Sequence, residues 1–551
     1  MQKIVSLFLA FVMLFGKSFE EINSWNLIFK NKVTLLVSFI GIIGYFILFK
    51  AIFSFLNCLI KKIDLEKIKF TKSNIIIKIF EDKPFFVSLL LILIFWLIYL
   101  VAFYPGILTP DSSYQILQFF NVHTKYSDWI IQLDPNVNIT NHHPVFHTML
   151  IGICVKLGKT ILDYNFGIFI YTLLQTFILA STLAYTIKYL SKINISSKIR
   201  MFILGIYCLV PMLPFYAVTD VKDTIYTALI VLYIVKLFDY IKFYKNKKIS
   251  LKQMIYWIVI IILISLFRNN GTYVVILSFI FAIFYSKTNM KRMGIVFLIY
   301  LILYKSYIGI LLPYFKISDT SIREMLSVPF QQTARYVKYH EEDLTQDEKE
   351  KIDKVLGYAD LSDRYKPKIA DPVKNKYNKY ATKEDLKEYF KVWTSGLFKH
   401  PGCYVQAFLN NTYGYFYPTN KGWYLYYNQK NIVNEKGNIE YGFNNSTEKL
   451  RNGLKLYGNF FRSVPLIGLI SNIGFNTCVI LVYAVYLIMQ KGKRKYLIAL
   501  LPHFITILFC LVSPVNNYFR YAMPYIFAMP ITTIFLIKEI TKKGEEKNGE
   551  K

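Results

Sequence analysis

Long runs of apolar residues dominate the pattern along the chain, and polar positions gather in the short stretches between them. Many runs approach or reach the roughly 17–25 residues that cross a bilayer as a helix. The pattern therefore predicts an all-α polytopic membrane protein. The apolar runs cover residues 3–16, 33–56, 85–103, 145–162, 165–187, 201–217, 223–241, 253–267, 272–285, 293–312, 464–489, 496–512 and 521–538.

One long polar segment, residues 313–463, interrupts this pattern and is too long to be a simple connector. Within it, residues 380–393 (YATKEDLKEYFKVW) have the spacing of an amphipathic helix that begins at Thr382, with acidic residues in its first turn. We expect this segment to form one small, mostly helical domain.

Composition narrows the class of protein further. The chain is 54% hydrophobic and only 18% charged, whereas a soluble chain has about 25% charged residues. A soluble enzyme, a disordered chain and a secreted disulfide scaffold are therefore excluded. Five of the six cysteines lie in apolar stretches and only Cys403 lies in a polar one, so no disulfide framework is implied.

The formal net charge of +30 comes largely from short basic loops between the apolar runs, so it does not indicate nucleic-acid binding. Lys and Arg in short loops mark the cytoplasmic side. Consistent sidedness requires 145–162 to be a re-entrant or juxtamembrane helix instead of a full span. We then expect 12 spans in a bacterial cytoplasmic membrane with both termini inside. The predicted parts are a transmembrane domain (1–312) with a first external loop (104–164), an extracytoplasmic domain (313–463), C-terminal spans (464–538) and a charged cytoplasmic tail (539–551).

Candidate chemistry gathers in the loops predicted to face outward. In the first, Pro105-Gly106 ends a span and Asp111-Ser112-Ser113 begins a new helix, with Gln115 on the same side. Asp111 is a candidate catalytic carboxylate close to the membrane surface. The alternative is an N-cap aspartate that accepts a backbone N–H.

Histidines follow farther along the same loop. His142 and His143 are candidates for contact with an acceptor. His143 and His147 are four residues apart and share a helix face, which together with a carboxylate suggests a divalent-metal site. The alternative is that these histidines hydrogen-bond the loop backbone.

A second outward turn contains Asp220, Lys222 and Asp223 between two apolar helices. One charged residue at a turn needs no functional explanation. Two carboxylates and a lysine in an otherwise nearly uncharged helix pair favour a functional site.

Three arginines complete the set of candidates. Arg268 and Arg520 lie at the outer ends of predicted spans, and Arg335 begins the polar domain. Guanidinium groups bind phosphate oxygens through two hydrogen bonds. Contact with phospholipid headgroups is the simpler alternative for each, but collectively they suggest an outward pocket for an anionic, membrane-anchored ligand.

Six motifs together resemble those of a family of low-GC bacterial membrane proteins of uncharacterised function. That family is similar to the GT-C glycosyltransferases, which include the protein mannosyltransferases and the lipid A aminoarabinose transferases. The resemblance runs from about residue 85 to 530. The motifs are YPG with PDSSYQ (104–115), HHPVFHT (142–148), TDVKDT (219–224), RNNG (268–271), FQQTARYV (330–337) and RYAMP (520–524).

This resemblance implies a GT-C-like bundle that transfers a sugar from a polyprenyl-phosphate donor on the outer face, usually with inversion. Asp111 matches the carboxylate of the first external loop, and Asp220 or Asp223 matches the second external acid. The HHP at 142–144 resembles the superfamily's His/Lys-Pro-Pro, with only one proline. The paired Asp-Glu of many members is missing, so metal use and the acceptor are not carried over.

Inverting transfer needs a base for the acceptor hydroxyl and fixed cations for the leaving phosphate. Asp111 is the candidate base, and the candidate cations are Lys222, Arg268, Arg335 and Arg520. The expected partners are a polyprenyl-phosphate sugar, membrane lipids and an envelope glycan, lipid or protein acceptor, without nucleic acid. The alternatives are a transporter or lipid flippase, against which no internal repeat is found, and a non-catalytic envelope subunit.

Overall fold

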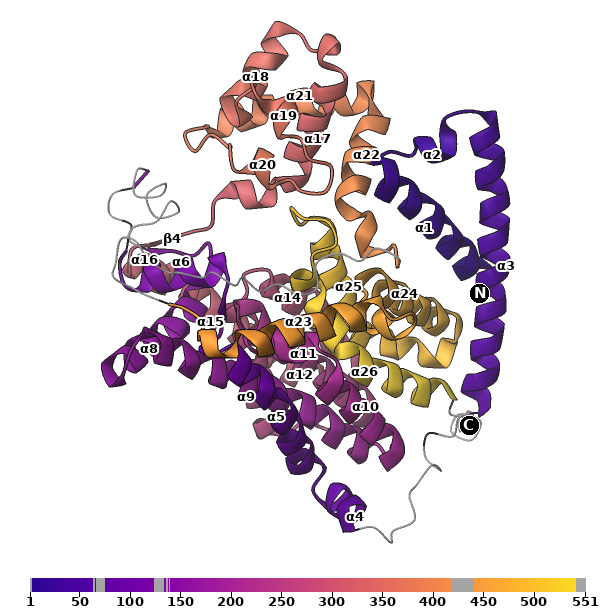
Figure 1. Cartoon of the computed structure of the whole chain (residues 1–551), viewed down its shortest axis with the longest axis vertical. Helices are drawn as coiled ribbons and strands as arrows, with labels where there is room; N and C mark the ends of the chain where they lie inside the picture. The colour runs from indigo at the N-terminus through magenta and orange to yellow at the C-terminus, as the bar shows by residue number, and fades with distance from the viewer. Residues whose placement is uncertain are drawn as a thin grey trace.

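The computed structural model describes residues 2–62, 65, 75–122, 133–134, 137, 139–418 and 441–541, and nearly all of its regular structure is helical. Figure 1 shows a bundle of long helices with a separate lobe of shorter helices at one end and a hairpin of α1 and α3 along one side. The fold class predicted from the apolar runs, an all-α membrane protein, agrees with this architecture.

The first half of the chain contains α1 (Gln2–Ile22), α2 (Asn26–Phe29), α3 (Lys32–Lys62), α4 (Ile75–Asp82), α5 (Pro84–Ala102), β1 (Ile107–Leu108), α6 (Pro110–Phe119), β2 (Ile139–Thr140), α8 (Val145–Ile161), α9 (Tyr164–Lys192), α10 (Ser197–Leu209), α11 (Met212–Ala217), β3 (Thr219–Asp220), α12 (Lys222–Phe243), α13 (Leu251–Phe267) and α14 (Gly271–Tyr285).

The second half begins with a long helix in which a π-helical turn, Tyr307–Leu311, joins two α-helical stretches. Its elements are α15 (Met290–Ser306), α16 (Leu312–Tyr314), β4 (Ile317–Ser318), α17 (Ser327–Tyr339), α18 (Gln346–Leu356), α19 (Leu361–Arg364), α20 (Asp371–Lys374), α21 (Lys383–Lys399), α22 (Pro401–Thr412), α23 (Glu448–Ser463), α24 (Ile473–Met489), α25 (Leu497–Leu511) and α26 (Phe519–Thr541).

Seven helices in the described part of the chain are long and apolar enough to cross a membrane, and α13, α14 and α24 are shorter apolar helices. The seven are Lys32–Leu56, Pro84–Ala102, Tyr164–Lys192, Lys222–Phe243, Met290–Tyr314, Lys491–Leu511 and Phe519–Thr541.

Two of the predicted continuous runs are broken. The run 201–217 divides into α10 and α11 at Val210-Pro211, because proline disfavours a helical residue before it and cannot donate a helix hydrogen bond. The run 464–489 is α-helical only from Ile473, and a 3-10 turn, Ile467–Ser471, precedes it.

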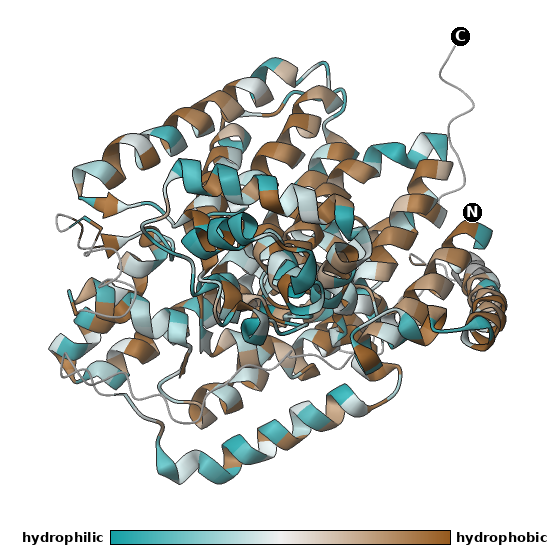
Figure 2. Cartoon of the chain, turned by 90° about the horizontal axis from the view of Figure 1, so that it is seen from above, coloured by the Kyte–Doolittle hydropathy of each residue, from teal (hydrophilic) through white to brown (hydrophobic). Residues whose placement is uncertain are grey.

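Burial separates the central helices from the peripheral ones. Helix α12 is buried along almost its whole length, and α9 and α26 pack against it. Helix α3 instead exposes apolar side chains on most of its surface, with Leu36 and Ile40 both 60% exposed. Figure 2 shows the hydrophobic colouring of such peripheral helices. Apolar surface of this extent suits contact with lipid and not with water.

The lobe consists of α17 to α21 and has its own apolar core, which includes Phe330, Val337, Leu356 and Tyr389. The expected amphipathic helix is confirmed as α21. The Thr382 hydroxyl accepts a hydrogen bond from the Asp385 N–H at 3.1 Å, and the Asp385 carboxylate accepts one from the Thr382 N–H at 2.8 Å. This reciprocal pair explains why the helix begins there.

The rest of the polar segment returns to the bundle. Helix α22 leads from the lobe toward α25. Leu454 of α23 packs with Tyr99 and Leu100 of α5, and the Arg451 guanidinium donates to the Ala102 carbonyl at 3.1 Å. The lobe is therefore smaller than the predicted 313–463 domain.

Two short parallel strand pairs connect loops that carry candidate residues. Strand β1 pairs with β3, which places Leu108 opposite Asp220. Strand β2 pairs with β4, which ties the loop before His142 to the chain that enters the lobe. These pairings bring the loop that follows α5 close to the start of α12 and to the base of the lobe.

Candidate functional site

Five charged residues from four helix ends meet beneath the lobe. Asp111 lies in the first turn of α6, Lys222 and Asp223 begin α12, Arg268 ends α13, and Arg520 begins α26. We call these five residues the charge cluster. All were candidates from the sequence, and the fold brings residues up to 409 positions apart into contact.

Asp111 does not cap its helix. Thr109 is the N-cap of α6. Its hydroxyl accepts a hydrogen bond from the Ser112 N–H at 3.3 Å, and the Ser112 hydroxyl accepts one from the Thr109 N–H at 2.8 Å. The Asp111 carboxylate instead accepts hydrogen bonds from Arg520 at 2.8 Å and Lys222 at 3.2 Å. The N-cap alternative for Asp111 is thus excluded.

Asp223 is the second carboxylate of the cluster. It is ion-paired with the guanidinium of Arg268 and lies 3.2 Å from Nε of Arg520. Its side chain is 1% exposed, whereas that of Asp111 is 27% exposed. Asp223 therefore lies on the inner side of the cluster and Asp111 on the side that solvent reaches.

Aromatic rings support both guanidinium groups. The guanidinium carbon of Arg268 lies 5.4 Å from the centroid of the Tyr226 ring and 5.2 Å from that of Tyr521. Arg520 lies 5.3 Å from the ring of Tyr518. A cation over the face of an aromatic ring is attracted to it, so these rings stabilise both guanidinium groups. These tyrosines were not among the residues predicted from the sequence. Two of them, Tyr518 and Tyr521, flank Arg520 in the YFRYAMP stretch and could have been predicted from that proximity.

The histidine pair of the HHP motif borders the cluster. Lys222 Nζ donates to Nδ1 of His143 at 3.0 Å, so the neutral ring carries its proton on Nε2. Burial and then the nearby Lys222 charge hold the pKa of His143 well below its usual value. His142 lies near Glu324, which precedes the lobe, and near Lys374 of α20. Burial lowers the pKa of His142. Lys374 of the lobe and Glu324 at its entrance thus add charges beside the cluster.

Electrostatics keep Asp111 ionised. Burial opposes its charge, but Arg520 and Lys222 outweigh that effect and hold the pKa of the carboxyl well below its usual value. Two carboxylates and three cations leave the cluster with one net positive charge, because His143 is neutral. The cluster can therefore attract an anion that reaches it from solvent.

Asp220 lies apart from this cluster. Its buried carboxyl group contacts the Thr172 hydroxyl at 3.0 Å and Nε2 of Gln175 at 3.2 Å. Burial raises its pKa well above the usual value, in contrast to Asp111. A Cβ at Gly106 would lie 2.6 Å from Oδ2 of Asp220, which explains a glycine with φ of +143° there. Asp220 thus joins the loop that follows α5 to α9 and is not part of the charge cluster.

The remaining polar candidates of the loop are also internal. Ser112 and Gln115 are both fully buried. Nε2 of Gln115 donates to the Thr148 hydroxyl at 2.9 Å, and its Oε1 lies 3.1 Å from Nδ1 of His147. Ser112 and Gln115 are thus both engaged in hydrogen bonds within the protein.

His143 and His147 do not share a metal site in this structure. Nε2 of His147 lies 2.6 Å from the Tyr171 hydroxyl and Nδ1 contacts Gln115, so both ring nitrogens have protein partners. His143 contacts Lys222, a cation. The predicted shared helix face is wrong, because α8 begins only at Val145 and His143 lies before it.

Arg335 belongs to the lobe and not to the charge cluster. It is 6% exposed in α17, donates to the Tyr365 hydroxyl at 2.8 Å and packs over the ring of Tyr339. Its contacts indicate a role in the lobe core, and the fold does not bring it to the other cations predicted to bind the donor phosphate.

Comparison with known proteins places the chain in a family. The profile of the family of unknown function DUF6020 matches residues 1–550. The chain belongs to DUF6020. No curated protein and no solved structure matches it. For this DUF6020 protein the chemistry must therefore be argued from its own residues.

The charge cluster of this DUF6020 protein lies at one end of the bundle. Helix α12 begins with Lys222-Asp223 and ends beside the basic stretch 242–252, and its 22 residues span about 33 Å. That length is close to the thickness of a bilayer core, about 30 Å. The cluster and the basic loop thus lie at opposite ends of a helix whose length matches the thickness of a bilayer core.

Proposed function

We propose that this protein is a membrane glycosyltransferase of GT-C type that moves a sugar from a polyprenyl-phosphate-linked donor to a cell-envelope acceptor on the outer face of a bacterial cytoplasmic membrane. The acceptor is a glycan, a lipid or a protein. The observation that carries the proposal is the charge cluster, in which three cations and two carboxylates converge at one end of the helix bundle beneath a polar lobe.

The cluster suits the phosphate of a lipid-linked donor. Arg520 and Lys222 both contact Asp111, the most exposed member, so an entering phosphate can take over their hydrogen bonds. Guanidinium and ammonium groups bind phosphate oxygens strongly. The polyprenyl chain would lie among the apolar helices while the phosphate stays at headgroup level.

Phosphate binding would also prepare Asp111 as a base. Once Arg520 and Lys222 turn toward the phosphate, the pKa of Asp111 rises, because these two cations hold it down. Asp111 then takes the proton of the acceptor hydroxyl, and the oxygen of that hydroxyl forms a bond to the anomeric carbon of the sugar. The bond from that carbon to the phosphate oxygen breaks, and the phosphate leaves with the electron pair.

Asp223 has a different role in this scheme. It pairs with Arg268 and Arg520 on the inner side of the cluster. There it keeps both guanidinium groups in place when Asp111 no longer contacts Arg520. Asp223 is thus a positioning residue, and Asp111 is the proposed catalytic one.

Topology supports an outward site. Basic loops follow the far ends of α12 and α14, at residues 242–252 and 286–292, and such loops favour the cytoplasmic side. The proposed arrangement has 12 spans, both termini inside and the lobe outside. The terminal residues 542–551, which contain most of the proposed cytoplasmic tail, lie outside the described part of the chain.

The test compares lipid-linked sugars and envelope glycans by mass spectrometry in cells that carry the wild type, Asp111→Asn or Asp363→Asn. Asp363 is an exposed lobe aspartate and serves as the matched control. We expect Asp111→Asn alone to accumulate a polyprenyl-phosphate sugar, with one glycan losing a residue. If Asp111→Asn matches the wild type while a deletion changes the envelope, catalysis by Asp111 is ruled out and transport or scaffolding replaces this proposal.

A further inference from the structure

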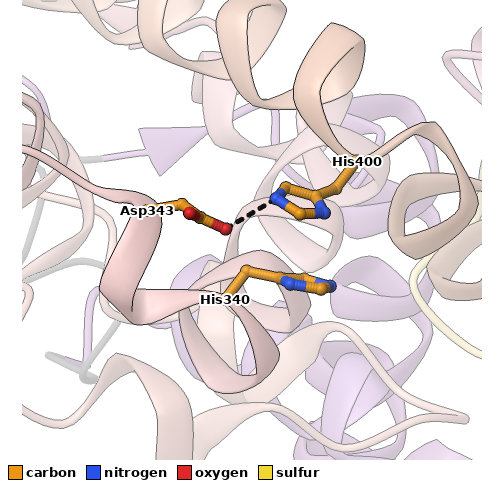
Figure 3. Close-up of side chains that lie close together, drawn as sticks. All are labelled: His340, Asp343 and His400. Carbon is orange, nitrogen blue, oxygen red and sulfur yellow. Dashed lines mark hydrogen bonds and ion pairs between the residues drawn. The ribbon is translucent and has the colours of Figure 1, made fainter.

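Two histidines and one aspartate form a second group, in the lobe. His340 ends α17, Asp343 closes the 3-10 turn Glu341–Asp343, and His400 joins α21 to α22. One ligand atom from each lies within 4.8 Å of the other two. Figure 3 shows the three side chains close together, with His340 and Asp343 on one segment and His400 on another.

The contacts within this group are close. Nε2 of His400 lies 2.7 Å from Oδ2 of Asp343. The rings of His340 and His400 stack with centroids 3.8 Å apart and planes 20° from parallel. The side chains of His400 and Asp343 are 29% and 43% exposed, so an ion from solvent can reach them.

Helix ends fix the backbone at these positions. The His340 N–H donates to the Tyr336 carbonyl at 2.9 Å, and the His400 N–H donates to the Gly396 carbonyl at 2.9 Å. A Cβ at residue 396 would lie 2.8 Å from Cε1 of Tyr336. Glycine at this position therefore lets the end of α21 approach the end of α17, which brings the two imidazoles together.

The donor set matches a transition metal. Two imidazoles and a carboxylate, with a fourth position open to water, are ligands that Zn²⁺ takes in tetrahedral sites. Tetrahedral Zn²⁺ with bonds of about 2.0 Å needs ligand atoms about 3.3 Å apart. To reach this geometry, the two imidazole rings must rotate out of their stacked arrangement so that one nitrogen of each points at the ion. The neighbouring acids Glu341 and Glu342 add negative potential.

We propose that His340, Asp343 and His400 bind a divalent transition-metal ion, with Zn²⁺ as the occupant, on the surface of the lobe. The ion would connect the end of α17 to the junction of α21 and α22, which lie 57 or more residues apart in the chain. This site is separate from the charge cluster and does not depend on the proposed transfer reaction.

The test uses full-length protein in detergent, stripped with a chelator and titrated with Zn²⁺. We expect the wild type to hold one equivalent more Zn²⁺ by elemental mass spectrometry than the double variant His340→Ala/His400→Ala. The dissociation constant for Zn²⁺ should rise by at least about 100-fold in that variant. Losing even an outer-shell partner of a ligand lowers metal affinity by roughly 10–100-fold.

Two controls separate this site from other sources of metal binding. His142→Ala, beside the charge cluster, and Asp363→Asn, in the lobe, should keep the wild-type stoichiometry. Co²⁺ added to the wild type should give the visible absorption of a tetrahedral site, a readout that needs no variant. Absence of that absorption, or equal Zn²⁺ in the wild type and the double variant, would overturn the proposal and leave an ordinary His–Asp ion pair.

Discussion

Replacing Asp223 by asparagine is expected to destabilise the protein much more than the same change at Asp111. Asp223 is 1% exposed, and its partners Arg268 and Arg520 are 14% and 10% exposed. Removing one partner of a buried ion pair costs about 3–5 kcal/mol, because the other charge is left buried and unpaired. The Coulomb attraction across 3.2 Å at an effective dielectric constant of about 20 is about 5 kcal/mol, which agrees with that range.

Asp111→Asn should cost only about 1–2 kcal/mol, since water reaches its partly exposed carboxylate and Arg520 keeps Asp223 as a partner. Thermal unfolding of both variants in one detergent, followed by tryptophan fluorescence, measures the difference, with Asp363→Asn as the exposed control. The midpoint should fall clearly for Asp223→Asn, slightly for Asp111→Asn and not at all for the control. Equal midpoints for Asp111→Asn and Asp223→Asn would refute the assignment of inner and outer roles.

Three further outcomes follow from the structure. Asp220→Asn should keep wild-type glycans and stability. Asp220→Ala should lower the free energy of unfolding by about 1–3 kcal/mol, because it leaves the buried donors of Thr172 and Gln175 unpaired. Loss of transfer in a stable Asp220→Asn protein would return Asp220 to the catalytic set. Because the folded state lowers the pKa of Asp111, the ionised carboxylate stabilises the fold at pH values above the ordinary aspartate range. This stabilisation is lost as the pH falls toward the lower pKa of the folded state. The difference in unfolding midpoint between wild type and Asp111→Asn should thus be constant from about pH 8 to 5 and shrink below about pH 4; a change near neutrality would contradict it. In a Cys58→Ser background, an impermeant maleimide applied to intact cells should label Asp363→Cys and not Ser250→Cys, and the reverse pattern would invert the proposed topology.

The hydrophobic pattern of the sequence was sufficient to predict an all-α membrane protein and one helix cap. Thr382 was recognisable as a helix start because capping depends on residues three positions apart. The break at Pro211 was missed, because hydropathy alone joins 201–217 into one run and takes no account of the proline ring. Local rules also failed at Asp111, where the neighbouring Thr109 takes the capping role.

The charge cluster was predicted as a set of residues but not as a set of contacts. Asp220 and Asp223 are three positions apart, yet one faces Thr172 and the other faces arginines from two distant helices. Only long-range packing decides between those environments. The group of His340, Asp343 and His400 was not foreseen, because its members come from helix ends brought together by the lobe core.

Binding of polyprenyl phosphate to the purified protein, measured by native mass spectrometry, tests the central claim most directly. Arg520→Gln should weaken binding at least tenfold, since charge-assisted hydrogen bonds contribute about 1.5–3 kcal/mol each. Arg335→Gln, which changes an equally buried arginine outside the cluster, should bind like the wild type, and polyprenol without phosphate should not compete. If Arg520→Gln and the wild type bind equally, or if polyprenol competes equally, the charge cluster is not the phosphate site and the account is contradicted.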